Sequence, residues 1–142
     1  MRSQKQNHPI YGRLTWSDDD ETWFGEVVVG TKKVRLAICV DEPSVIPDDY
    51  AVIYRALIER MSSLVRDASM WIVSDLADWL PDEEKQNPAR IAQQMQIAEV
   101  EIYGGDGATV TFDGPTAIEE SGHTIEARFD EGARLHSFAL CG

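Results

Sequence analysis

One segment of this sequence, from Asp48 to Leu80, contains neither proline nor glycine and carries apolar side chains at helical spacing. Apolar residues three or four positions apart predict an amphipathic helix. As one straight rod the segment would be about 50 Å long, whereas a domain of this size has a radius of gyration of about 14–15 Å. We therefore expect the helix to bend or break between Ser62 and Ser69, where weak helix formers gather.

The residues on both sides of this segment alternate between apolar and polar, which predicts strands. The expected strands are Ile10–Trp16, Trp23–Val29 and Lys33–Val40 before the helical segment, and Ile97–Tyr103, Ala108–Phe112, Thr124–Phe129 and Leu135–Leu140 after it. A short helix is expected before the second group, with Asn87 as its cap and Pro88 at its first position.

Strands, then helices, then strands, without regular alternation, predict an α+β fold. We expect an N-terminal three-stranded antiparallel meander, a central long helix that is bent or broken, a short helix and a C-terminal four-stranded antiparallel meander. The expected pairs are Trp16 with Trp23, Leu14 with Gly25, Val27 with Leu36, Ile102 with Val110 and Ile125 with Phe138. A three-residue loop, Gly105–Gly107, would place Gly107 in the left-handed region.

The length of 142 residues suits one domain, residues 1–142, with the polar residues 1–9 as a loose arm. No apolar run reaches the roughly 18–20 residues that a membrane span needs, and the N-terminus lacks the apolar core of a signal peptide. We therefore expect a cytoplasmic protein without membrane contact. The two cysteines, Cys39 and Cys141, do not make a disulfide scaffold.

The chain has 13 basic and 25 acidic side chains and a formal net charge of −12. This balance argues against nucleic-acid binding, because phosphate contacts require Lys and Arg. A basic protein partner is favoured instead, although acidic solvated surface is the simpler explanation of most of this charge.

Sequence motifs for catalysis are missing. There is no Gly-x-Ser-x-Gly nucleophile motif, and the glycines near residue 105 lie between two strands, where no phosphate-binding loop is expected. The histidines His8, His123 and His136 are not spaced for a shared metal, and the acidic run lacks the pattern of a calcium loop. We expect no catalytic residue, no metal and no cofactor.

The strongest candidate for a partner-binding site is the acidic turn between the first two predicted strands and the aromatic residues beside it. Its residues are Trp16, Asp18, Asp19, Asp20, Glu21, Trp23 and Phe24. Aromatic residues are enriched at the energetic centres of interfaces. The alternative is structural, because Trp16 and Trp23 could be a cross-strand aromatic pair that closes the sheet.

The layout resembles a set of small acidic bacterial proteins of unknown function, some of which are immunity proteins beside polymorphic toxins. The resemblance rests on Trp23–Gly25, the apolar strand and long helix that follow, Gly122–Ile125, the Glu131–Gly132 turn and the final Leu140–Gly142. It covers most of the chain but includes no specific motif. It implies an α+β binding protein without a cofactor and carries over no catalytic residue.

We therefore expect a non-enzymatic protein-binding domain, such as an immunity or antitoxin-like inhibitor of a basic partner. One alternative is a small hydrolase or ligand-binding protein that uses the region around His123. Another is a self-associating structural domain, such as a homodimer, formed through Phe24 and Val28 on the far face of the first strands.

Overall fold

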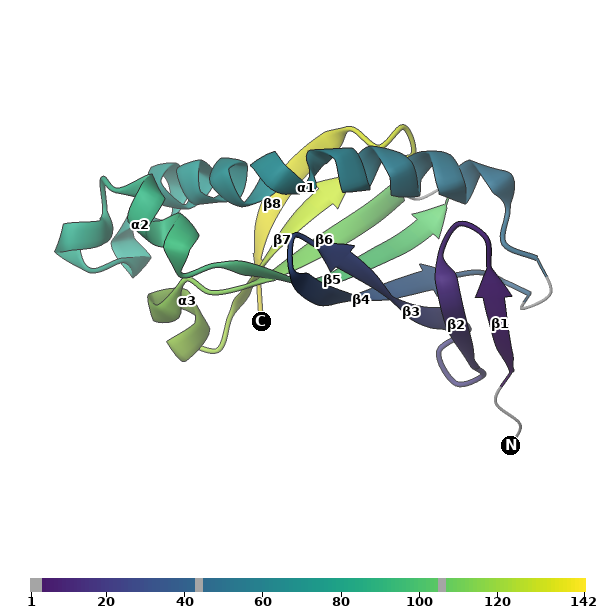
Figure 1. The fold of residues 1–142 in the computed structure, drawn as a ribbon. Coiled ribbons are helices and arrows are strands. Elements are labelled where there is room, and N and C mark those ends of the chain that lie inside the picture. Colours follow the sequence, from purple (N-terminus) through teal and green to yellow (C-terminus); the bar gives the residue numbers. More distant parts are fainter. Residues whose placement is uncertain (1–3, 43–44, 105–106) are drawn as a thin grey trace.

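The computed structural model describes residues 4–42, 45–104 and 107–142. These residues form one eight-stranded sheet, and a long helix lies across one of its faces (Figure 1). The α+β class expected from the sequence is therefore confirmed.

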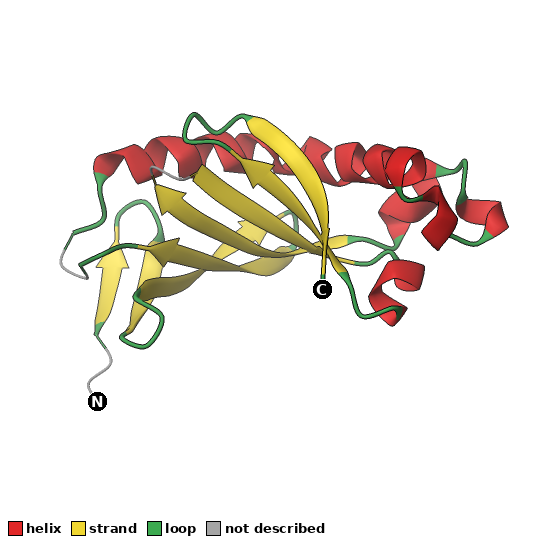
Figure 2. Cartoon of the chain, turned by 180° about the vertical axis from the view of Figure 1, so that it is seen from behind, coloured by secondary structure: helices red, strands yellow, loops and turns green. Residues whose placement is uncertain are grey.

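The strands are β1 (Lys5–His8), β2 (Gly12–Ser17), β3 (Thr22–Val29), β4 (Lys32–Cys39), β5 (Gln96–Gly104), β6 (Gly107–Asp113), β7 (Thr124–Phe129) and β8 (Leu135–Cys141). The helices are α1 (Asp48–Asp75), α2 (Pro88–Gln93) and α3 (Thr116–Glu120), with 3-10 turns η1 (Ala77–Trp79) and η2 (Asp82–Glu84). Figure 2 shows the long helix α1 along one face of the sheet and the short helices at one end of it.

The strands follow one another across the sheet in chain order. Within the described strands, all neighbouring pairs are antiparallel except β4 and β5, which run parallel with Leu36 opposite Val100 and Ile38 opposite Ile102. Parallel neighbours need a crossover connection, and α1 supplies it. The two predicted groups of strands are therefore halves of one mixed sheet, and the N-terminal group has four strands rather than three.

The additional strand corrects the expectation of a loose arm for residues 5–8, whereas residues 1–3 of the predicted arm lie outside the described residues. Residues 5–8 form β1, which pairs antiparallel with β2 so that Lys5 lies opposite Thr15 and His8 opposite Gly12. The tip of this hairpin is anchored on α1, because the Tyr11 ring packs edge-on against Tyr54 at 5.0 Å between centroids. The arm is therefore ordered by pairing and by this aromatic contact, which its polar composition did not reveal.

The predicted break between Ser62 and Ser69 is wrong: α1 is one continuous helix of 28 residues. Leu57, Leu64 and Ile72 are at most 1% exposed, so one side of the helix is buried along its length. Serines in the expected break accommodate the helix, because the Ser69 hydroxyl donates to the Val65 carbonyl at 2.7 Å. At 1.5 Å per residue the helix is about 42 Å long, and η1, η2 and α2 lie around the end that overhangs the sheet (Figure 1).

Two predictions about local structure are confirmed, and one element was missed. The Asn87 side chain caps α2 by accepting a hydrogen bond from the Arg90 N–H at 3.1 Å, with Pro88 at the first position. Gly107 has a φ of 95°, while Gly105 and Asp106 of the same predicted loop lie outside the described residues. The short helix α3 falls where the sequence predicted only a loop.

The predicted pairings have the correct faces but, in three hairpins, the wrong register. Trp16 lies opposite Trp23, as predicted. The other partners are displaced by two residues: Val27 lies opposite Val34 rather than Leu36, Ile102 opposite Ala108 rather than Val110, and Ile125 opposite Leu140 rather than Phe138. A shift of two keeps each side chain on its predicted face.

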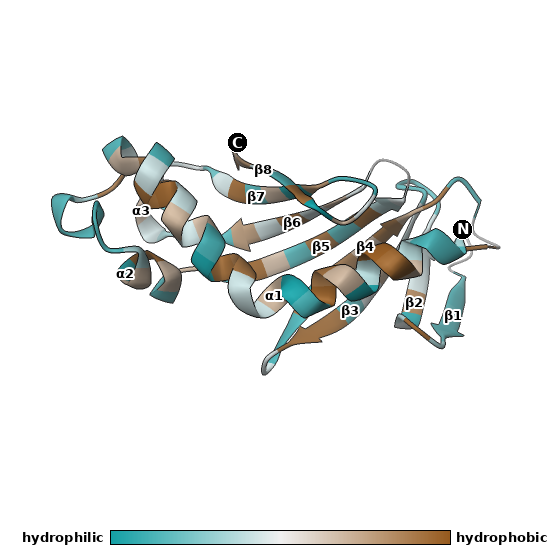
Figure 3. Ribbon diagram, turned by 90° about the horizontal axis from the view of Figure 1, so that it is seen from above, coloured by the Kyte–Doolittle hydropathy of each residue, from teal (hydrophilic) through white to brown (hydrophobic). Residues whose placement is uncertain are grey.

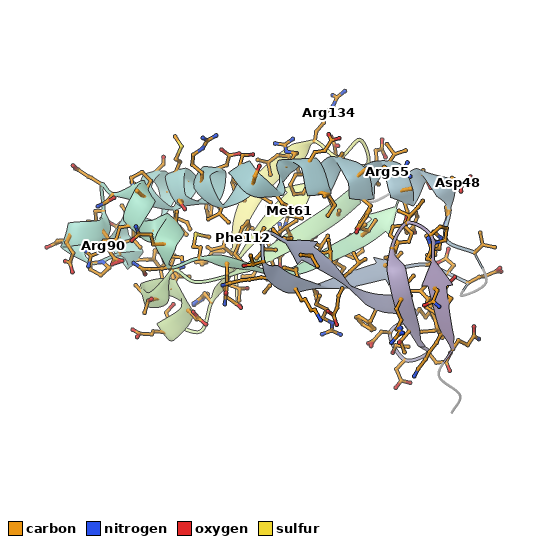
Figure 4. The ribbon with its side chains drawn as sticks, viewed as in Figure 1. Asp48, Arg55, Met61, Arg90, Phe112 and Arg134 are labelled. Atoms are coloured by element: carbon orange, nitrogen blue, oxygen red, sulfur yellow. The ribbon has the colours of Figure 1, made fainter. Side chains whose placement is uncertain are left out.

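The core lies between α1 and the face of the sheet that the predicted alternation assigned to it. Figure 3 shows α1 running across the strands, with the turn of the β3–β4 hairpin on one side of it and β8 on the other. Met61 from the helix and Phe112 from the sheet belong to this core (Figure 4). Within the described residues, no helix combines the length and the apolar character needed to cross a bilayer.

Candidate functional site

The acidic turn predicted as a binding site is the exposed connection between β2 and β3. β1 and β2 stand steeply to the other strands and carry this turn to the side of the sheet opposite α1 (Figure 1). Asp18, Asp19, Asp20 and Glu21 are all exposed, and the Ser17 hydroxyl donates to Asp20 Oδ2 at 3.0 Å. The turn therefore offers carboxylates to solvent on the open side of the sheet.

The two tryptophans beside the turn lie in the core. Trp16 is 6% exposed and Trp23 is 2% exposed, and their ring centroids are 5.4 Å apart. The Trp16 indole N–H donates to Asp18 Oδ1 at 2.7 Å, whereas that of Trp23 has no hydrogen-bond partner among the described residues. The rings thus support the turn from inside, and a partner would meet the carboxylates and Phe24.

The turn continues into a hollow of about 380 Å³ on the open face of the sheet. We call it the acidic hollow; its lining residues are Asp20, Thr22, Phe24, Arg35, Cys39, Glu99 and Glu101. Strand alternation places these residues on one face, and the parallel register of β4 and β5 puts Arg35 beside Glu99. The hollow therefore exists only because two strands far apart in sequence are neighbours.

Among the described residues that line the acidic hollow, Arg35 is the only basic one. Its Nε lies 3.4 Å from Glu99 Oε2, and its guanidinium lies over the Phe24 ring at 4.2 Å from the centroid. A cation above an aromatic face is attracted by the ring quadrupole. Arg35 is thus held in place from two sides, and Phe24 is half-buried beneath it.

Glu101 is the carboxyl group of the hollow whose pKa is raised. Burial raises its pKa above the ordinary value of 4.5, and the nearby carboxylates of Glu99 and Glu126 raise it further, while Arg35 opposes this. The Tyr103 hydroxyl donates to Glu101 Oε1. Arg35 does not offset burial and the neighbouring carboxylates, so a further cation would stabilise the ionised form of Glu101.

Cys39, which also lines the hollow, is not arranged as a nucleophile. Burial raises the pKa of its thiol, and Glu101, Glu99 and Asp20 raise it further, against a lowering contact from Thr22. The Thr22 hydroxyl donates to the Asp20 carbonyl at 2.8 Å and lies 3.6 Å from Cys39 Sγ. Because the thiolate is the reactive form, this environment favours an inert thiol.

The region around His123 was the alternative site. His123 Nδ1 lies 3.1 Å from Ser121 Oγ, and its ring packs edge-on against Trp79 at 5.0 Å. The Ser121 hydroxyl donates to the Ile118 carbonyl at 2.6 Å, so its proton is not directed at the imidazole. This pair therefore does not have the arrangement of a serine nucleophile and its base.

Within the part of the chain that the structure describes, no three His, Cys, Asp or Glu side chains are grouped so that they could hold a metal ion. The three histidines lie at separate places, beside Tyr11, before β7 and in β8.

Sequence reasoning missed Arg35, Cys39, Glu99 and Glu101 as parts of one site. The two glutamates lie on the face of their strand that points away from the core, yet the Glu99 side chain is only 28% exposed and Glu101 is half-buried. The two-residue spacing of Glu99 and Glu101 already showed in the sequence that they share one face of their strand. The pairing that brings them to β4 was not, because no local turn specifies it.

No family model, curated protein or solved structure matches this chain.

Proposed function

We propose that this chain is a non-enzymatic protein-binding domain whose acidic hollow and adjoining turn accept basic side chains of a partner protein. An immunity or antitoxin-like inhibitor of a basic partner is the form of this function that the chain's charge and layout favour. The proposal keeps the acidic turn of the sequence prediction and adds the carboxylates of β5 to it.

The observation that carries the proposal is the imbalance of charge in the hollow. Asp20, Glu99 and Glu101 face a single cation, Arg35, which gives 1 − 3 = −2 when all four groups are ionised. The exposed Asp18, Asp19 and Glu21 beside it extend this to −5. Lys or Arg side chains entering the hollow would provide the missing counter-charge, and complementary potentials accelerate association.

The chemistry of the hollow also favours binding over catalysis. Its thiol is held in the protonated form, and its one guanidinium is already engaged with Glu99 and Phe24. The hollow is therefore better suited to receiving a charged side chain than to activating a nucleophile.

The test begins with capture of proteins from the source cells on the tagged chain, at low and at high salt. We expect one stoichiometric basic protein that is released by salt, because salt screens exposed charge pairs. Purified chain is assayed in parallel with esterase, phosphatase and nuclease substrates. Turnover that disappears in His123→Ala would overturn the proposal in favour of the alternative enzyme.

The captured protein is then tested against a variant in which the turn is reversed in charge, Asp18→Lys, Asp19→Lys and Asp20→Lys. Its matched control carries Asp75→Lys, Asp78→Lys and Glu83→Lys. These three residues are exposed and lie at the C-terminal end of α1 and in the turns that follow it, at the end of the molecule away from β1 and β2 (Figure 1). Binding lost in the first variant and kept in the second supports the hollow as the site. Equal behaviour of the two variants contradicts it.

A further inference from the structure

The two edges of the sheet differ in how they are protected from pairing with another strand. β1 has four residues, all polar, and includes Lys5. β8 has seven residues and contains no Asp, Glu, Lys, Arg or Pro. Natural sheets usually protect their edges with short strands, charges or proline, so β1 has the ordinary protection and β8 lacks it.

The outer side of β8 is open. Figure 2 shows β8 at the front edge of the sheet, with α1 behind it. Its residues Leu135, Phe138 and Leu140 face the helix side and are only partly buried, while Ser137, Ala139 and Cys141 face the open side. The strand therefore presents unpaired backbone groups between an apolar rim and a rim of small side chains.

We propose that β8 is a homodimer interface, in which β8 of a second copy pairs antiparallel with it about a two-fold axis at Phe138. Such an axis, perpendicular to the sheet, keeps both copies of α1 on the same side and joins the two sheets into one. It places Ser137 of each copy opposite Ala139 of the other. This surface differs from the acidic hollow, so the proposal is independent of the function proposed above.

The register follows from the charges on β7, the strand next to the edge. Arg128 lies beside Ser137, and Glu126 lies beside Ala139. In two-fold antiparallel pairing, opposite residues share a face, so the axis must pass through a residue and cannot lie between two. The residues on which it could lie near the middle of the strand are Ser137, Phe138 and Ala139.

Only the axis at Phe138 places opposite charges in the same row, that is, among side chains that lie beside one another across neighbouring strands. With the axis at Ser137, Arg128 of one copy shares a row with Arg128 of the other, and with the axis at Ala139, Glu126 shares a row with Glu126. With the axis at Phe138, Arg128 of each copy shares a row with Glu126 of the other. The residues between them are Ser137 and Ala139, which are small enough for these long side chains to reach across.

On the face of the sheet that α1 covers, the same register brings apolar side chains together. Phe138 stacks on Trp71 of α1, with centroids 5.6 Å apart and planes inclined by 30°. A two-fold axis at Phe138 sets this aromatic pair beside its copy in the second molecule. Aromatic clusters of this kind are typical of the centres of interfaces.

The dimer is expected to be weak, because the part of β8 that is regular enough to pair with a second copy is short. The register between β7 and β8 shifts between Arg128 and Phe129, so the strand is irregular near His136. An interface of this size belongs to the small class that is typical of transient association. The chain itself should then be in monomer–dimer equilibrium at high protein concentration.

The experiment is sedimentation velocity from about 10 µM to about 1 mM protein, a range that covers weak association, in salt that screens the overall negative charge. We expect the wild type to dimerise within this range. A strict monomer at the highest concentration would overturn the proposal.

The register is tested with Arg128→Glu and Glu126→Arg. Each single variant places like charges in both rows, so each should dimerise at least about tenfold more weakly than the wild type. An equimolar mixture of the two variants restores opposite charges in both rows, and we expect it to form a heterodimer. Failure of the mixture to associate more strongly than either variant alone would overturn the register.

The double variant Glu126→Arg with Arg128→Glu guards against effects of misfolding. It keeps the ion pair that joins Arg128 Nε and Glu126 Oε1 at 3.5 Å within one copy, with the charges exchanged. Dimerisation within about threefold of the wild type is expected, since the coupled pair is restored. A monomeric double variant with a wild-type circular dichroism spectrum would contradict the proposal.

Discussion

Gly25 shows how one residue sets the approach of β2 to β3. A Cβ atom at this position would lie 2.7 Å from Leu14 Cδ2 and 3.0 Å from the Arg13 carbonyl oxygen. Leu14 is fully buried and cannot move away. The contact between Leu14 and Gly25 predicted from sequence therefore exists, and it requires the absence of a side chain.

We predict that Gly25→Ala lowers the free energy of unfolding by about 1–3 kcal/mol, because it overpacks this contact. The measurement is urea unfolding followed by tryptophan fluorescence. Gly132→Ala is the control, since its Cβ would be no nearer than 3.4 Å to another atom, and a change within about 0.5 kcal/mol is expected. Equal effects of the two substitutions would contradict the role of Gly25.

Glu101 makes the free energy of unfolding depend on pH. Its pKa in the folded chain is raised above 4.5, so between these two values the folded chain holds a proton that the unfolded chain has lost. The free energy of unfolding therefore falls as the pH rises from 4.5 through the folded pKa. Below 4.5 the group is protonated in both states and contributes no pH dependence.

Glu101→Gln removes this ionisation and can still accept the hydrogen bond from Tyr103. We predict that, at pH 7.5, Glu101→Gln has a higher free energy of unfolding than the wild type, and that the gain shrinks as the pH is lowered towards about 4. Urea unfolding at the two pH values measures it, with Glu131→Gln in an exposed turn as control. Lower stability of Glu101→Gln at pH 7.5 would mean that the ionised carboxylate stabilises the fold.

At the scale of elements, α1 is the clearest difference between expectation and structure. Local propensity favoured a break near Ser62, but burial of one apolar side along the whole helix outweighs the few tenths of a kcal/mol that separate serine from better helix formers. The expected conflict with domain size does not arise, because the helix overhangs the sheet and other elements pack around that end.

We predict that Ser62→Pro lowers the free energy of unfolding by about 3 kcal/mol or more, since proline removes a helical hydrogen bond and clashes with the preceding turn. Ser62→Ala at the same exposed site should raise it by about 0.5 kcal/mol or less. Both are measured by urea unfolding with circular dichroism. A Ser62→Pro variant as stable as the wild type would show that the helix is interrupted there.

The hairpins show which part of a sheet can be predicted from sequence. Alternation identified the face of each strand correctly, because one face is buried and a shift of one residue would reverse it. A shift of two leaves the faces unchanged, so alternation could not separate Val34 from Leu36 as the partner of Val27. The position and the number of the turn residues decide between them: the β3–β4 turn lies one residue earlier than predicted, and the other two turns differ from the prediction in length.

At the scale of the whole molecule, the parallel contact of β4 and β5 organises both the sheet and the acidic hollow. It joins residues more than 60 positions apart, and nothing in the local sequence of either strand specifies the other as its neighbour. This is why the acidic turn could be proposed from sequence while Glu99 and Glu101 could not. The charge of the site was visible in the composition, but its location depended on topology.

The most direct test of the proposed function is the association rate of the captured basic protein with the wild type, the turn-reversed variant and the control reversed at Asp75, Asp78 and Glu83. Both variants change the net charge by the same amount. We predict association about tenfold slower or more for the turn-reversed variant, and a rate near that of the wild type for the control, because steering depends on where charge lies at the interface. Equal rates for the two variants would contradict the assignment of binding to the acidic hollow.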